Sequence, residues 1–455
     1  MRVIIVGCGK VGTRIAGQLS QEGCNVTVID KNPLHVRRVS DNNDVLGIEG
    51  DGSSYSTLEE AGVSTADLVI AVTDSDEKNL LCCLIAKKGG KAATIARVRN
   101  PAYSKEAPFF RTNFDLAMAV NPEMAAAAEI ARVVRFPSAI NIEVFAKGHV
   151  ELLTFRLAAD SILVGKTLFY IHSHLKCDVL VLVVRRGTQV TVPSGDFVLE
   201  GGDILSVVYR QGDEVGFFQK IGIETNPVRT VMIVGGGKIT YYLARRLLRD
   251  KMTVKIIEQD ESRCQELAEY LHGSVDIVQG DGCDEELLLE EGIENVDGFV
   301  ALTGMDELNI MLSLFAKNKN PKVKLVTKIT RIGFADVIDS LDLGTIVNPK
   351  DITADYMVHY SRSLQASLDS NMEALYKLAD GQAEVMEFHV RQESRVTGRE
   401  LQKMRLKKNI LIGKIYRDGS SFTPSGRTTI KVGDSVVLVA KTEDKIMDLE
   451  DILEG

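Results

Sequence analysis

The chain has 455 residues, of which 45% are hydrophobic and 26% are charged, and its formal net charge is −9 at pH 7. This composition suits a globular protein with several apolar cores, and its acidic, mixed charge argues against a nucleic-acid binder, which needs a basic face. Apolar runs such as 179–184 fall far short of the roughly 20 residues of a membrane-spanning helix. We therefore expect neither a nucleic-acid partner nor a transmembrane segment.

Apolar strands alternate with amphipathic helices over residues 1–140. We expect strands at 2–6, 25–30, 44–50, 67–73, 91–98 and 115–120. We expect helices at 11–23, 33–42, 53–63, 76–90 and 122–136. Strands that alternate with helices in this way predict a parallel, doubly wound sheet of the Rossmann type.

The pattern changes over residues 141–222. We expect a strand at 150–158, then a short helix, then two strands joined by a tight turn at Arg186-Gly187, and a further strand within 201–210. Short strands joined by glycine turns, with little helix between them, indicate a small α+β lobe.

Most of the chain is an internal repeat. Matching pairs are Gly7 and Gly235, Asp30 and Glu258, segments 71–79 and 301–309, and segments 192–195 and 423–426. The offset between partners drifts only from 228 to 231 residues, which indicates a duplication with small insertions in loops. We therefore predict an A–B–A′–B′ architecture. The Rossmann domains are expected at 1–140 and 229–366, and the α+β C-lobes at 141–222 and 372–455. The linker between the two halves is expected at 222–230.

The cysteines and histidines give no sign of a metal site. The seven cysteines, at 8, 24, 82, 83, 177, 264 and 283, are irregularly spaced and include no C-x-x-C pair. Reduced thiols are therefore expected rather than disulfides or zinc ligands. His172 and His174 are two residues apart in an expected helix, so they do not share a face, and we interpret them as surface residues.

The stretch GCGKVG, residues 7–12, follows the first expected strand and opens the first expected helix. In this context Gly7 permits a tight turn, Gly9 lets a pyrophosphate approach the backbone, and Gly12 lets the helix pack close to the sheet. Asp30 ends the second strand, where a carboxylate can bind both ribose hydroxyls and repel a 2′-phosphate. The motif predicts a site for NAD or an adenosine nucleotide rather than NADP, and a Rossmann fold that binds no ligand is the alternative.

The second copy of the motif departs at its last position. Gly235 and Gly237 are kept and Glu258 supplies the acid, but Thr240 stands where the third glycine would be. A β-branched side chain there must displace the helix slightly or find a gap. Whether the second site binds a nucleotide is left open.

Further polar residues follow strands at the expected ligand edge of the first sheet. Arg97 could reach a phosphate, as could Lys328 at the matching place in the second half, although a solvated charge at the strand end is an equal alternative. Thr73 and Asp74 follow the fourth strand, while Asp51 and Gly52 follow the third and could border an adenine.

The chain resembles the TrkA-type regulatory subunits of bacterial and archaeal potassium-uptake systems. The resemblance depends on GCGKVG, Asp30, AVTDSDEKN (71–79) and IARVRNPAY (95–103), which are followed by a lobe with VPSGD, and the whole arrangement is then repeated. Each half is similar to an RCK (regulator of potassium conductance) unit. The resemblance implies a first nucleotide site at Gly7, Cys8, Gly9, Lys10, Val11, Asp30, Thr73, Asp74 and Arg97. It implies a second site at Gly235, Gly236, Gly237, Lys238, Ile239 and Glu258.

The same resemblance implies a function. It indicates a cytoplasmic protein, peripheral on the inner face of the membrane, whose homotetramers form a ring of eight RCK units beneath a membrane-embedded Trk-type potassium transporter. NAD(H) would be its cofactor, with ATP and ADP as regulatory ligands that gate or activate transport.

Two alternatives are weighed against this hypothesis. An NAD-dependent oxidoreductase needs an acid/base group beside the nicotinamide, and the two lobes of about 80 residues show no such constellation or known catalytic motif. We therefore expect no enzymatic activity. A nucleotide-insensitive scaffold for a membrane transporter is the second alternative.

Overall fold

The computed structural model describes residues 1–100, 103, 106–135, 141–145, 150–175, 179–209, 217, 220, 228–331, 341, 343–369, 372–379, 381–444 and 446–454. The chain divides into two compact units. One comprises Met1–Arg135 and Pro227–Val358, and the other comprises Phe136–Asn226 and His359–Gly455. Each unit therefore combines segments from both halves of the repeat.

A parallel sheet in the order β3-β2-β1-β4-β5-β6 forms the first lobe of the first unit. Its strands are β1 (Arg2–Val6), β2 (Asn25–Asp30), β3 (Leu46–Glu49), β4 (Leu68–Ala71), β5 (Ala93–Arg97) and β6 (Met118–Val120). Its helices are α1 (Lys10–Gln21), α2 (Pro33–Asn42), α3 (Tyr55–Glu60), η1 (Val63–Thr65), α4 (Asp76–Gly89), α6 (Ala107–Asn113) and α7 (Pro122–Arg135). The strand order reverses between β1 and β4, and this is where open α/β sheets bind ligands.

The second lobe of this unit repeats the topology in the order β14-β13-β12-β15-β16-β17. Its strands are β12 (Thr230–Val234), β13 (Thr253–Glu258), β14 (Asp276–Gln279), β15 (Gly298–Ala301), β16 (Lys324–Lys328) and β17 (Thr345–Val347). Its helices are α10 (Lys238–Arg249), α11 (Glu261–Tyr270), α12 (Glu285–Glu290), η4 (Ile293–Asn295), α13 (Asp306–Lys319) and α15 (Pro349–Asp369), of which the part up to Val358 belongs to this unit. The repeat extends to strand register, because Val3 pairs with Val26 and Val231 pairs with Val254.

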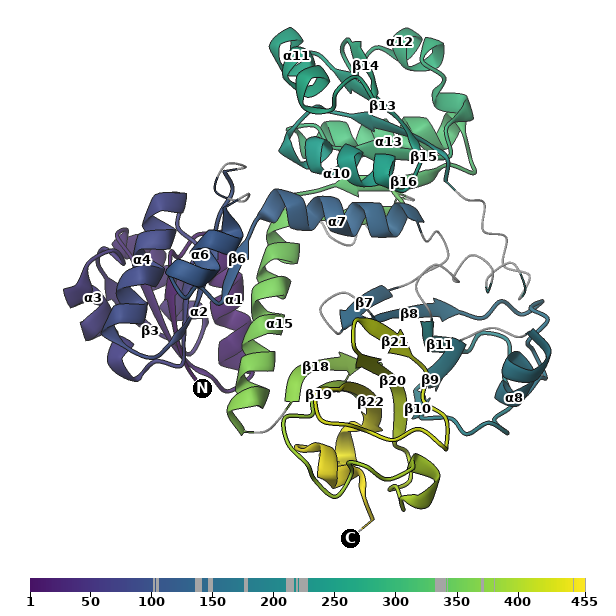
Figure 1. Ribbon diagram of the computed structural model, residues 1–455. Coiled ribbons are helices and arrows are strands. Elements are labelled where there is room, and N and C mark those ends of the chain that lie inside the picture. The colour runs from purple at the N-terminus through teal and green to yellow at the C-terminus, as the bar shows by residue number, and fades with distance from the viewer. Residues whose placement is uncertain are drawn as a thin grey trace. The chain divides into compact units, whose positions relative to one another are not determined.

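The last helix of the first lobe packs on the second lobe. The helix α7 lies along α10 (Figure 1). Its buried residues Ala127, Ile130 and Val134 join one apolar cluster with Leu243 and Leu247 of α10. In the other direction, α15 of the second lobe approaches the first, because Asp351 pairs with Arg14 of α1 at 2.7 Å. The two lobes are therefore joined by apolar packing and by ion pairs.

The second unit contains two antiparallel sheets, in the orders β10-β9-β11-β8-β7 and β18-β19-β22-β20-β21. The first lobe contains β7 (Asn141–Phe145), β8 (Val150–Arg156), α8 (Leu168–Tyr170), η3 (Ile171–Leu175), β9 (Val179–Arg186), β10 (Gln189–Thr191) and β11 (Ile204–Tyr209). The second contains β18 (Met372–Leu378), β19 (Ala383–His389), η5 (Leu401–Lys403), β20 (Leu411–Arg417), β21 (Ser420–Phe422), β22 (Ser435–Lys441), η6 (Thr442–Asp444) and η7 (Leu449–Ile452). One apolar cluster, which includes Leu152, Leu182, Val437 and Val439, joins the two lobes.

These elements confirm the predicted fold class of two Rossmann-type sheets and two small α+β lobes. The hairpin turn in the second C-lobe falls at Asp418-Gly419, where both residues have positive φ, while its counterpart falls at Gly187-Thr188, one residue after the predicted position. Most of the predicted linker, together with Cys177, lies outside the described residues. Within the described part of the chain, no helix is long and apolar enough to cross a membrane.

Candidate nucleotide-binding site

The glycine turn between β1 and α1 forms the floor of a crevice. Gly7 has φ of +105°, and a Cβ there would lie 3.0 Å from the backbone of Val72 and Thr73, so only glycine fits without strain. Gly9 is the N-cap of α1, and as a glycine it has no side chain to bond the free amides of the helix. A Cβ at Gly9 would have nothing within 4 Å. The open space at Gly9 and the free amides of the helix start suit a pyrophosphate.

Asp30 organises this turn from the end of β2. Its Oδ2 accepts a hydrogen bond from the Cys8 amide at 2.7 Å, and its Oδ1 accepts one from the Asn32 amide at 2.8 Å. His35 places its Nδ1 3.7 Å from the same carboxylate. The carboxylate therefore holds a fixed orientation beside the crevice, as ribose binding requires.

A cavity of about 790 Å³ opens over the glycine turn. The predicted first-site residues that line it are Gly7, Gly9, Lys10, Val11, Asp30, Asp51, Gly52, Thr73, Asp74 and Arg97. Cys8 does not line it; its side chain is buried, and burial together with Asp30 raises the pKa of the thiol to about 12. The structure thus brings all the predicted residues of the first half except Cys8 to one cavity, while their contact with a ligand stays a prediction.

The wall of the cavity after β3 is held by an ion pair. The ammonium of Lys31 lies 2.6 Å from Oδ2 of Asp51, and Ser53 donates to Oδ1 from both its amide and its hydroxyl. The hydrogen bond from Lys31 is the main cause that lowers the pKa of Asp51 to about 2. A carboxylate that is already paired in this way borders the crevice without adding an unpaired negative charge.

Asn79, which the sequence interpretation missed, ties two strand ends together. This fully buried residue of α4 accepts from the amide and the hydroxyl of Thr73 at 2.8 and 2.7 Å. It donates to the carbonyls of Thr73 and Arg97 at 3.2 and 2.9 Å. Asn309 makes the same four bonds to Thr303 and Lys328 in the second lobe. The sequence held a signal for this role, because the matching segments 71–79 and 301–309 both end in this asparagine.

Arg97 is partly buried and is not a fully solvated charge at a strand end. Its guanidinium donates to the carbonyl of Thr73, and its Nε is buried without a hydrogen-bond partner. Burial is the main cause that lowers its pKa, and the neighbouring Arg99 contributes. A partly buried guanidinium that lines the cavity suits a phosphate ligand. Lys328 matches it, because its Nζ donates to the carbonyl of Leu302 at 3.3 Å.

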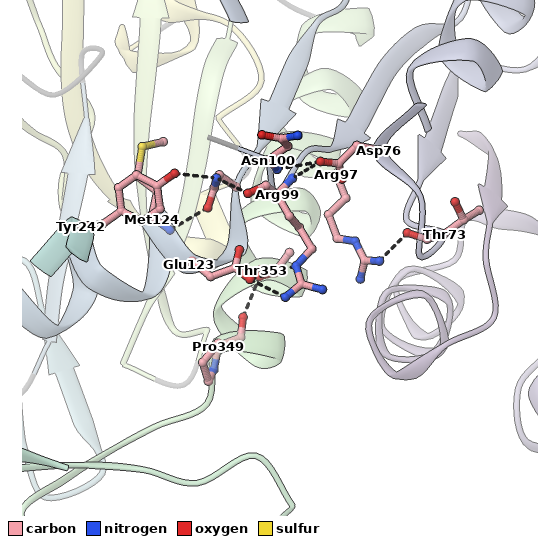
Figure 2. A network of polar contacts seen from close by, with 11 residues as sticks. Thr73, Asp76, Arg97, Arg99, Asn100, Glu123, Met124, Tyr242, Pro349 and Thr353 are labelled. Atoms are coloured by element: carbon pink, nitrogen blue, oxygen red, sulfur yellow. Dashed lines mark hydrogen bonds and ion pairs between the residues drawn. The ribbon is translucent and has the colours of Figure 1, made fainter. Parts of the chain in front are cut away.

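Polar contacts continue from the cavity wall to the second lobe, as Figure 2 shows. Two residues beyond Arg97, the amide of Arg99 donates to Asp76 at 2.8 Å, and the side chain of Arg99 donates to Glu123 at the start of α7. Asn121, just before α7, donates to the hydroxyl of Tyr242 on α10 at 3.3 Å. The end of β5 is therefore linked to both α7 and α10.

Side chains of the second lobe form hydrogen bonds to its own glycine turn. Glu258 accepts from the Gly236 amide at 2.5 Å, as Asp30 does from Cys8, but Arg263 also donates to the Gly236 carbonyl at 2.8 Å. Gly237 leaves open space, as Gly9 does. Thr240 is fully buried, and its hydroxyl donates to the carbonyl of Gly235. The threonine is therefore accommodated by a hydrogen bond, whereas a Cβ at Gly12 would lie 1.8 Å from the Gly7 carbonyl oxygen.

The remaining predicted residues of the second site, Lys238 and Ile239, begin helix α10 after Gly237, and Gly235 has φ of +104°. Their role as ligand contacts stays a prediction. In the described part of the chain, no group of three or more His, Cys, Asp and Glu residues could hold a metal ion.

Models of two known domain families match the lobes of this chain. The TrkA-N domain family matches residues 3–110 and 231–349, and the TrkA-C domain family matches residues 152–214 and 385–454. The chain is 32% identical to Trk system potassium uptake protein TrkA homolog 1 of Methanosarcina mazei over 446 residues, which cover 96% of this chain and 97% of that protein. It is 33% identical to a TrkA homolog of Archaeoglobus fulgidus, over 99% of this chain and all of that protein.

Solved structures share the fold at low sequence identity. The RCK domain of GsuK is similar with a TM-score of 0.62 and 18% identity, over 97% of this chain and 92% of that one. The GsuK channel bound to NAD is similar with a TM-score of 0.63 and 17% identity, over 97% of this chain and 77% of that one.

Proposed function

Because this chain belongs to the TrkA family of potassium-uptake proteins, we propose that it is a regulatory subunit that binds NAD(H) or adenine nucleotides and gates a membrane-embedded potassium transporter. The observation that carries the proposal is the cavity of about 790 Å³ over the first glycine turn. The protein would act in the cytoplasm, at the inner face of the membrane. It would form a homotetramer, a ring of eight RCK units, each with one Rossmann domain and one C-lobe.

The chemistry of the cavity suits a nucleotide. The Asp30 carboxylate would bind ribose hydroxyls, the start of α1 would bind phosphates, and Arg97 would approach the phosphates from β5. NAD supplies two ribose groups and a pyrophosphate, and ATP or ADP supplies one ribose and a longer or equal phosphate chain. GsuK, whose RCK domain shares this fold, has a structure with NAD bound, which supports NAD as a ligand here.

The contacts around the cavity suit a regulator. A ligand changes a conformational equilibrium only when it binds one conformation more tightly than another. The end of β5 bears Arg97 at the cavity and, two residues later, Arg99 in contact with α7. Since α7 packs on the second lobe, a shift of β5 on ligand binding would alter how the two lobes are joined.

The proposal is tested by potassium flux in vesicles that contain a Trk-type membrane subunit, with the purified chain added in NADH, NAD⁺, ATP or ADP. We expect flux to depend on the nucleotide, and Asp30→Ala to abolish that dependence. Glu258→Ala removes the equivalent contact to the second glycine turn and shows whether the second site contributes to that dependence.

Flux that is indifferent to every nucleotide would contradict the proposal and favour a nucleotide-insensitive scaffold. Steady oxidation of NADH in the presence of small carbonyl compounds, followed by absorbance, would favour an oxidoreductase instead.

A further inference from the structure

Helix α10, in the second lobe of the first unit, carries a row of basic residues. Residues 238–251, which span α10 and the turn after it, include five Lys and Arg residues and one acid. The bases are Lys238, Arg245, Arg246, Arg249 and Lys251. Arg246 is half-buried, and the other four are exposed. We call these five residues the basic face.

The repeat shows that the basic face is special to the second lobe. Helix α1 matches α10 at an offset of 228 residues. Of the five bases, Lys238 alone has a basic counterpart, which is Lys10. The other four stand opposite Gly17, Gln18, Gln21 and Gly23. Since the two helices pack on sheets of the same topology, the fold does not require these charges.

The basic face lacks carboxylate partners. Within the described residues, none of its five side chains forms an ion pair with an acidic side chain. Burial is the main cause that lowers the pKa of Arg246, and the charges of Arg249 and Arg132 lower it further. Holding like charges together costs free energy, which an anionic surface beside them would offset.

Tyrosine rings extend the basic face. The guanidinium of Arg245 lies over the ring of Tyr241, 5.6 Å from its centroid, and Nη1 donates to the Tyr241 hydroxyl at 3.0 Å. The Tyr241 ring meets that of Tyr270 edge to face, with centroids 5.7 Å apart, and Tyr270 is 56% exposed. Tyrosine is enriched at the headgroup level of bilayers, because its ring is apolar and its hydroxyl is polar.

The opposite face of the same sheet carries an acidic segment. Residues 281–294, which include α12, contain seven Asp and Glu residues and no Lys or Arg. Leu288 of α12 packs in one apolar cluster with Met232 of β12, whereas α10 packs in another with Val231. Successive residues of a strand point to opposite faces of a sheet, so α10 and α12 lie on opposite faces. An anionic surface would attract the first helix and repel the second.

We propose that the basic face of α10 binds the anionic lipid headgroups of a membrane surface. The contact goes beyond the proposed function, in which the chain reaches the membrane through a transporter. It holds the second lobe against the bilayer with α10 toward the lipid and α12 away from it. Bases spread along an exposed helix suit a planar anionic surface, where each Lys or Arg contributes about fivefold to binding.

Co-sedimentation of the full chain with vesicles tests the proposal without a transporter or a nucleotide. We expect binding to vesicles of phosphatidylcholine and phosphatidylglycerol in equal parts, little binding to phosphatidylcholine alone, and loss of binding at high salt. Arg245→Gln with Arg249→Gln should weaken binding at least about tenfold, and Arg245→Lys with Arg249→Lys should retain it. Lys88→Gln with Lys91→Gln removes two exposed bases of the first lobe and should leave binding unchanged.

The other outcomes contradict the proposal. Equal binding to both kinds of vesicle, binding to neither, or unchanged binding of the double glutamine variant would show that the basic face does not bind lipid. Binding that requires a Trk-type membrane subunit in the vesicles, and that the glutamine variant weakens, would show that the face binds an acidic part of a protein instead. None of these results affects the nucleotide-dependent flux by which the proposed function is tested. Equal melting temperatures of the variants and the wild type show that a loss of binding is not caused by unfolding.

Discussion

Arg99 and Glu123 join the carboxyl end of β5 to the start of α7. The Nε and Nη2 atoms of Arg99 both donate to Oε1 of Glu123, at 2.9 and 2.6 Å (Figure 2). The exposed fractions of the two side chains differ, at 49% for Arg99 and 10% for Glu123. The other carboxylate oxygen, Oε2, is buried without a hydrogen-bond partner. The arginine therefore supplies the partner on which the buried carboxylate depends.

This imbalance predicts unequal effects of removing each partner. Arg99→Ala leaves a nearly buried carboxylate unpaired, and we expect it to lower the free energy of unfolding by about 2 kcal/mol. Glu123→Ala leaves an arginine that water can solvate, so we expect a smaller loss. Adding Glu123→Ala to Arg99→Ala should recover part of the stability. Urea unfolding of the three variants measures this, and equal, additive losses would contradict the expectation.

Gly9 and Gly12 should separate binding from stability. Gly9 has φ of −69° and free space around its missing Cβ, so Gly9→Val should fold with little change in melting temperature. The valine would occupy the place of the pyrophosphate, and we expect at least about a tenfold loss of NADH affinity. Fluorescence titration with NADH measures the affinity, and unchanged binding would contradict a phosphate position at Gly9.

Gly12→Ala should show the opposite order of effects. Its Cβ would lie 1.8 Å from the Gly7 carbonyl oxygen, so α1 must move away from the turn, at a cost of about 1–3 kcal/mol. Thr240 shows that the second lobe accepts a larger side chain at this place. We therefore expect a lower melting temperature before any ligand is added. A variant as stable as the wild type would show that α1 moves without cost.

The sequence predicted what local patterns determine. Strands β1 and β2 and helix α2 have the predicted bounds, because apolar runs, Asn32 as a cap and Pro33 at the helix start act within a few residues. The helix α6 was not predicted. The role of Asn79 was also missed, since it depends on a contact between two strand ends that no local pattern encodes. The place of Lys350 in the lining of the first cavity was missed for the same reason.

Asn79 and Asn309 offer a matched pair for testing which lobe binds the ligand. Each is fully buried and makes four hydrogen bonds at the end of its sheet. Replacing either with alanine leaves buried backbone groups unpaired, so we expect both variants to lose about 2–4 kcal/mol of stability. Only Asn79→Ala should also weaken nucleotide binding, because Thr73 and Arg97 line the first cavity. Equal weakening by Asn309→Ala would show that the second lobe contributes.

Lys324 gives a prediction for pH dependence. It occupies the register position of Ala93 in the first sheet, and burial lowers its pKa from 10.5 to about 8. Below pH 8 the lysine is protonated in both states, so the folded state bears the full cost of the buried charge. As the pH rises from 8 toward 10.5, the folded state loses the proton first and this cost disappears.

Because the side chain is only partly buried, we expect Lys324→Met to stabilise the protein at pH 7 by about 1–2 kcal/mol, and the gain to vanish near pH 10.5. Urea unfolding of both proteins across this range measures the difference, and a gain that is constant with pH would show that packing, rather than charge, is its cause.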